Sequence, residues 1–290
     1  MKDPDEKIKE NNEAFAKFLA EMLEPHIPAI NAGLQKLGQW FEGVRTDLAP
    51  LLIKIAQIDW KAVKERIESM PARSRKAMII ASSEGWFFNW INSFRDTFEL
   101  VENLQAAKAD EVDEILKAHY TTDMDWYAGQ LTNLYPKRKP AIEAAVSAHK
   151  NYGPEGYYLS IPVFLAQADG MLSEITGIPS AMDKSNGVVK GSVWVKDRIG
   201  DNQKVKDLLH QLLNLHTMDI LKSKGQRDKE SIEKGKVFDA LNRHQVMHGE
   251  VSDYGTELNS FKAFSFLVFI GLHVPGMLES PHLTQANPST

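Results

Sequence analysis

The residues with the clearest capacity for chemistry lie in one short stretch near the C-terminus, residues 242–249, with the sequence NRHQVMHG. Arginine presents a fixed positive charge in a planar fork that fits phosphate oxygens, and histidine can give or take a proton near neutral pH. On a helix, His244 and His248 are four residues apart and share one face. Arg243 lies roughly 140° from His248 around the helix axis, a gap that its long side chain can close. We therefore expect these side chains to line one edge of a cleft.

This set of side chains is sufficient to cleave RNA without a metal ion. A histidine takes the proton of the ribose 2′-hydroxyl, that oxygen attacks the phosphorus, and the arginine stabilises the additional negative charge. Two other interpretations remain open. The cations can simply suit the dipole at a helix C-terminus. Alternatively, His244 and His248 have the spacing of a zinc pair, with His216, Glu250 or Asp253 as a third ligand, although a glutamine replaces the glutamate of the HExxH arrangement.

An acidic residue, Asp169, falls inside the apolar segment 157–176, which the sequence predicts to be a buried helix. A buried carboxylate is costly unless it is paired. Two interpretations of this residue stay open. Asp169 either bonds an arginine, a tyrosine or the backbone for structural reasons, or it orients Arg243 or His248 in the site.

The composition is that of a soluble globular protein, with 290 residues, 43% hydrophobic and 25% charged. The absence of cysteine excludes disulfides, thiol catalysis and cysteine-ligated zinc, and it fits a reducing cytoplasm. The N-terminus is too polar for a signal peptide, and apolar runs such as 263–274 are too short to span a bilayer. We therefore expect a cytoplasmic protein without a membrane contact.

Charge and missing motifs narrow the possible functions. The net charge is −5, so any contact with nucleic acid must use a local basic patch. No phosphate-binding loop, dinucleotide fingerprint or nucleophile elbow is found, which leaves ATPase, dehydrogenase and serine-hydrolase functions without support. We expect no cofactor and no bound metal.

Hydrophobic spacing predicts an all-α protein in two parts. Residues 1–72 form an N-terminal helical region whose third helix ends at Met70-Pro71, and residues 73–290 form the second domain. Residues 180–200 are predicted to be a loop or small hairpin with a β-like piece at 191–195, and residues 222–236 a solvated charged connector or a phosphate-facing arm. The helices expected beyond residue 90 span about 94–107, 110–134, 141–149, 157–176 with Pro162 near its first turn, 203–222, 237–248 ending at Gly249, and 257–273 capped by Thr256.

The sequence RHQVMH at 243–248 resembles the signature of HEPN domains (higher eukaryotes and prokaryotes nucleotide-binding). That signature is an arginine, a polar residue directly after it and a histidine after a short gap, which is four positions here. The blocks LNRHQVMHGEVSDYGTELNSFKAFSFL and GYYLSIPVFLAQADGMLSEITG resemble a group of uncharacterised bacterial proteins with a HEPN-like C-terminal half. The likeness covers about residues 80–278, and residues 1–70 resemble no family.

This resemblance implies a helical bundle that forms a homodimer, in which the motif helices of two subunits meet in a composite cleft. It implies a metal-independent endoribonuclease that leaves 2′,3′-cyclic phosphate ends and serves in toxin–antitoxin or antiphage (abortive infection) systems, with an antitoxin or regulatory protein as a further partner. By this likeness Arg243 and His248 carry the catalysis and His244 supports it. Asn242 is expected to support it as their neighbour in sequence, and Asp169 on the second interpretation given above. Some HEPN proteins bind nucleotides or RNA without cutting, so a non-catalytic binding or adaptor protein that uses the same cleft is the alternative.

Overall fold

The structure, a computed structural model, describes residues 59–89 and 94–279. The predicted helices over 5–24 and about 30–44, and most of the one over 50–69, lie outside the described residues. The chain divides into two units, Met1–Met70 and Pro71–Thr290. The second unit contains all five predicted site residues.

The all-α class is confirmed, because 77% of the described residues are helical and the strands form a single two-stranded sheet. The predicted domain boundary between residues 72 and 73 falls inside helix α4 (Trp60–Ser83).

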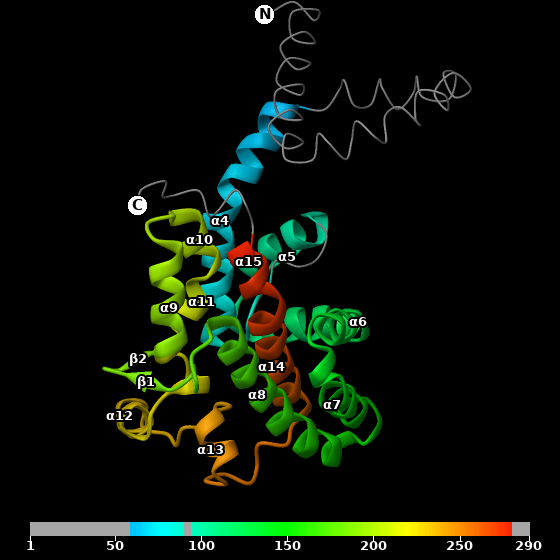
Figure 1. The fold of residues 1–290 in the computed structure, drawn as a ribbon, viewed down its shortest axis with the longest axis vertical. Coiled ribbons are helices and arrows are strands. Elements are labelled where there is room, and N and C mark those ends of the chain that lie inside the picture. The colour runs from blue at the N-terminus through cyan, green and yellow to red at the C-terminus, as the bar shows by residue number, and fades with distance from the viewer. Residues whose placement is uncertain (1–58, 90–93, 280–290) are drawn as a thin grey trace, which may run out of the picture. The chain divides into compact units, whose positions relative to one another are not determined.

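Figure 1 shows the elements in chain order, which are α4 (Trp60–Ser83), α5 (Phe94–Ala106), α6 (Ala109–Leu134), η2 (Pro136–Arg138), α7 (Lys139–Asn151), α8 (Gly153–Thr176), β1 (Lys184–Ser185), β2 (Val188–Val189), α9 (Lys190–Ile199), α10 (Gln203–Leu208), α11 (His210–Leu213), η3 (Leu215–Thr217), η4 (Asp219–Leu221), α12 (Lys224–Lys234), α13 (Arg243–Met247), α14 (Glu257–Val268), the π-helical turn η5 (Phe269–His273) and α15 (Val274–Glu279).

The core forms around α8 and α14, which pack against each other, while α7 packs on α8 and α6 on α14 (Figure 1). Every residue of α14 from Ala263 to Val268 is buried, and Phe264 meets Phe164 of α8 with ring centroids 5.3 Å apart. Thr256 begins this helix as predicted, because its hydroxyl accepts a hydrogen bond from the backbone N–H of Asn259 at 3.1 Å. Helix α8 of this pair also packs against α13, which carries the C-terminal motif.

The prediction that the apolar run near the C-terminus is too short to cross a bilayer was wrong about length. The run lies within a continuous helical segment, Glu257–Glu279, of 23 residues that is long and apolar enough to do so. Its interpretation as a buried helix is confirmed, because 78% of its most apolar window is buried inside the protein.

Two prolines lie in the interior of helices, although the sequence predicted that Pro71 ends a helix and that Pro162 lies near the first turn of one. α4 continues through Pro71, since Pro71, Ser74, Ala77 and Met78 are all buried and their packing outweighs the lost backbone hydrogen bond. α8 begins at Gly153 rather than 157, so Pro162 lies in its interior.

Because Pro162 has no N–H, the carbonyl of Tyr158 one turn earlier has no intrahelical donor. The hydroxyl of Tyr254 lies 3.5 Å from that carbonyl and can donate to it. This contact from the loop before α14 therefore partly replaces the backbone hydrogen bond that Pro162 removes from α8.

Several short elements between α8 and α14 also differ from the predictions. The β-like piece at 191–195 is helix α9, and the hairpin precedes it, with Asn186 (φ 52°) and Gly187 (φ 80°) in the two-residue turn. The predicted helix over 203–222 is broken into α10, α11 and two 3-10 turns. The charged connector is helix α12, which begins at a capping box between Ser223 and Gln226. The motif helix α13 has five residues instead of spanning 237–248.

Candidate functional site

The motif helix α13 is fixed at its start by the buried side chain of Asn242, which is 1% exposed. Its Oδ1 accepts from the backbone N–H of Gln245 at 3.2 Å and from Nη1 of Arg227 at 3.1 Å. Its Nδ2 donates to the carbonyls of Asp219 at 2.6 Å and Lys222 at 3.0 Å. Asn242 was predicted to support catalysis. The contacts show that it caps α13 and joins it to α12 and η4.

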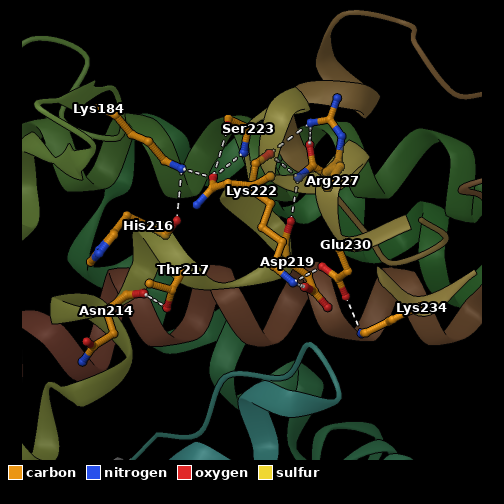
Figure 2. Close-up of polar contacts among 12 residues, drawn as sticks. Lys184, Asn214, His216, Thr217, Asp219, Lys222, Ser223, Arg227, Glu230 and Lys234 are labelled. Carbon is orange, nitrogen blue, oxygen red and sulfur yellow. Dashed lines mark hydrogen bonds and ion pairs between the residues drawn. The ribbon is translucent and has the colours of Figure 1, made fainter. Parts of the chain in front are cut away.

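The segment to which the side chain of Asn242 is bonded, η4 and the start of α12, contains a network of ion pairs, shown in Figure 2. Lys222 pairs with Asp219 and Glu230, and Glu230 also pairs with Lys234. Partial burial disfavours the charged form of Lys222, but its hydrogen bonds with the two carboxylates outweigh this and raise its pKa. The hydrogen bonds from Lys222 and Lys234 lower the pKa of Glu230. The N-terminal side of α13 therefore rests on a network of ion pairs.

Arg243 extends toward α8, where its Nη2 donates to Oδ2 of Asp169. Both side chains are 22% exposed. Arg243 Nε and Asp169 Oδ1 are buried, and neither has a hydrogen-bond partner in the part of the chain that the structure describes. The structure thus brings Asp169 and Arg243 together, a contact that fits both interpretations of Asp169, the structural bond to an arginine and the orientation of Arg243.

His244 and His248 lie together on the exposed side of α13, with ring centroids 4.3 Å apart and ring planes tilted by 48°. The side chain of His244 is 51% exposed, and its Nε2 lies 3.1 Å from Oε1 of Glu250. Among the described residues, no hydrogen bond or ion pair joins Arg243 to either histidine. Arg243 therefore does not turn toward His248 as the sequence suggested, because the carboxylate of Asp169 offers a charge-assisted partner.

Two residues that sequence reasoning did not place in the site complete it. Arg227 of α12 is 4% exposed and donates from Nη2 to Oε2 of Glu250 at 2.8 Å, and from Nη1 to the carbonyl of Lys222 at 3.0 Å. In the sequence Arg227 is one of several cations in a charged segment, and Glu250 was considered only as a metal ligand. The sequence feature that could have identified this segment as a helix is the capping box formed by Ser223 and Gln226.

The zinc alternative has no ligand set in the described ranges 59–89 and 94–279, where no group of three or more His, Cys, Asp or Glu side chains is placed to hold a metal ion. His216, one of its proposed ligands, belongs to η3, where its carbonyl accepts from Lys184 at 3.1 Å (Figure 2). Burial, followed by the charge of Lys184, lowers the pKa of His216.

Two neighbouring clefts of about 430 Å³ and 360 Å³ lie beside η4 and α12, the elements to which Asn242 is bonded. Neither cleft lies at the motif residues of α13. Ser83, Asp219, Glu230 and Lys234 line both of them. Arg243, His244 and His248 line neither. The two imidazoles lie at the exposed surface of the described unit.

Comparison of the chain with protein-family models, curated protein sequences and solved structures found no match. The resemblance to HEPN domains therefore rests on residues 156–177 and 241–267 alone, and the case for a function rests on the geometry of α13 and its neighbours.

Proposed function

We propose that this protein is an endoribonuclease of the HEPN type that cuts RNA without a metal ion. The observation that carries the proposal is the pair of exposed imidazoles at α13, with ring centroids 4.3 Å apart, on the same short motif that carries Arg243. Their exposure has no evident role in folding, whereas the helix that presents them is anchored by a fully bonded, buried Asn242. A fixed support under two exposed proton-transfer groups is the arrangement that a catalytic surface requires.

The proposed reaction assigns a role to each side chain. A histidine takes the proton of the ribose 2′-hydroxyl, the 2′-oxygen attacks the phosphorus, and the 5′-oxygen leaves as it is protonated. The products are a 2′,3′-cyclic phosphate and a 5′-hydroxyl. His248 is the assigned acid or base, and Arg243 holds the scissile phosphate. Asp169 uses one of the five N–H groups of this guanidinium, so others remain available to phosphate oxygens.

We further propose that the site is completed by a second copy of the chain, which places two copies of Arg243 and of His248 in one cleft. Met247, on the same short helix, has 43% of its surface exposed and supports a contact at this face. The net charge of −5 favours a narrow RNA substrate or a gated site over general RNA binding. A toxin–antitoxin or antiphage role in the cytoplasm, with an antitoxin or regulatory partner, belongs to this proposal.

The test is expression of the wild type and of His248→Ala from a tightly controlled promoter, with sequencing of RNA 2′,3′-cyclic phosphate ends. His216→Ala is the matched control, because it removes a histidine from η3 and leaves the motif intact. New ends at defined sites are expected with the wild type and His216→Ala and are expected to be absent with His248→Ala. RNA or nucleotide binding without such ends would instead support the non-catalytic binding protein.

A further inference from the structure

Glu250 is placed beside His244 by the way in which α13 ends. Gly249 has a φ of 68°, and its N–H donates to the carbonyl of Val246 at 3.3 Å. The N–H of Glu250 donates to the carbonyl of Gln245 at 2.8 Å. These two hydrogen bonds form a Schellman motif, which turns the chain back along the helix. The turn returns the carboxylate of Glu250 to the imidazole of His244.

The carboxylate is held at both of its oxygens. Oε2 accepts from the buried Arg227 at 2.8 Å, and Oε1 lies 3.1 Å from Nε2 of His244. Arg227 is fixed in turn by the carbonyl of Lys222 and the amide of Asn242. A buried cation requires a charged partner, and this ion pair holds the carboxylate of Glu250 in its orientation. One line of contacts thus runs from the interior of the unit to an exposed imidazole.

We propose that Glu250, anchored by Arg227, is a positioning residue that makes His244 the general base of the site, a proposal that rests on the ribonuclease function proposed above. The neutral ring of His244 donates its Nε2–H to Oε1 of Glu250, which leaves the lone pair on Nδ1. When Nδ1 takes a proton, the carboxylate stabilises the imidazolium. His244 therefore takes part in the reaction instead of only supporting His248.

His248 then acts as the acid. Among the described residues no carboxylate is paired with its ring, which lies 4.3 Å from that of His244. Nδ1 of His244 removes the 2′-hydroxyl proton, the bond from the 2′-oxygen to phosphorus forms, and the bond from phosphorus to the 5′-oxygen breaks. Protonated His248 gives its proton to the 5′-oxygen. The reaction consumes no other reactant, and solvent returns the proton from His244 to His248.

The substitution Glu250→Gln separates this role from a structural one. An amide has one oxygen and one NH₂ group, and the buried Arg227 requires the oxygen. The NH₂ group then faces Nε2 of His244 and forces that nitrogen to accept, so the proton moves to Nδ1. The control is Glu233→Gln, which removes an exposed carboxylate from α12 that pairs only with Lys229 among the described residues.

The first readout is the ¹⁵N spectrum of the histidine side chains in the full chain, which reports the tautomer whether or not RNA is cut. We expect the Nε2–H form of His244 in the wild type and in Glu233→Gln, and the Nδ1–H form in Glu250→Gln. The Nδ1–H form in the wild type, or an unchanged tautomer in Glu250→Gln, would overturn the positioning role.

The second readout is cleavage of the RNA identified in cells. Glu250→Gln is expected to lower kcat by on the order of 100-fold or more, with a smaller change in KM, because the base is protonated on the wrong nitrogen. His244→Ala, at an exposed position where folding is not at risk, should lose as much activity as His248→Ala. Full activity of His244→Ala would overturn its role as the base. A wild type that cuts no RNA would instead refute the proposed function, while the tautomer would still decide the positioning role.

Discussion

Replacing Asn242 by alanine tests how the motif helix is held. The substitution removes the cap of α13, both donors to the carbonyls of Asp219 and Lys222, and one acceptor for the buried guanidinium of Arg227. We expect a loss of stability much larger than that of an ordinary helix cap, because three segments lose a common partner.

The size of the effect can be worked out from these contacts. A lost N-cap costs about 1 kcal/mol. A hydrogen bond to a charged group is worth about 1.5–3 kcal/mol, and a buried group left without its partner adds a penalty of about 1–3 kcal/mol. Because these contributions overlap, we expect the free energy of unfolding to fall by about 3 kcal/mol. For a domain of this size that corresponds to a Tm decrease of about 6–12 °C.

The assay is urea unfolding monitored by circular dichroism, together with calorimetry, on Asn242→Ala and on Thr256→Ala. Thr256 is the matched control, since it also caps a helix through a single bond to a backbone N–H but is exposed. We expect the control to lose about 1 kcal/mol. Equal losses in the two variants would refute the reasoning that Asn242 joins α12, α13 and η4.

Further predictions concern the motif, its turn and two buried histidines. Arg243→Ala or His248→Ala should abolish RNA cleavage while circular dichroism remains that of the wild type, and EDTA should leave cleavage unchanged. Gly249→Ala should cost about 1–2 kcal/mol in urea unfolding, because its φ of 68° strains any residue with a Cβ, and should also lower cleavage by misplacing the next carboxylate. Burial lowers the pKa of His273 and His149 to about 4 from an ordinary value of 6.5. The unfolded chain therefore binds more protons between pH 6.5 and 4, and stability should fall as the pH falls through this window, by about 1.4 kcal/mol per pH unit for each group. His273→Gln should remove one such group and so reduce the slope of the free energy of unfolding, measured in urea, against pH. An unchanged slope in this variant would contradict the lowered pKa of His273.

The long helices could be predicted from the sequence because each spans several turns of one hydrophobic pattern. The helices over 94–107 and 110–134 begin and end within two residues of their predicted bounds. The predictions at Pro71 and Pro162 were wrong, because proline is tolerated inside a helix when tertiary contacts compensate for the lost hydrogen bond.

The short elements could not be predicted, since they take their shape from tertiary contacts. α13 has five residues and exists because Asn242 is bonded to segments about 20 positions away in the chain. Periodicity over so few residues carries little information.

The candidate site was predictable in part. The residue types at 243, 244 and 248 indicated phosphate binding and proton transfer, and the observed pairing of Asp169 with Arg243 fits both interpretations that the sequence left open for Asp169. The anchoring of Glu250 by Arg227 could not be predicted, because a charge pattern does not reveal that Arg227 is buried while the lysines of α12 are exposed. The turn at Gly249 that returns Glu250 to His244 depends on backbone geometry that a charge pattern does not reveal.

The most direct test of the central claim is the sequencing of RNA 2′,3′-cyclic phosphate ends in cells that express the wild type or His248→Ala at equal levels. We predict new ends at defined sites with the wild type alone, accompanied by growth arrest. The same ends in both strains would contradict the assignment of catalysis to the exposed imidazoles of α13.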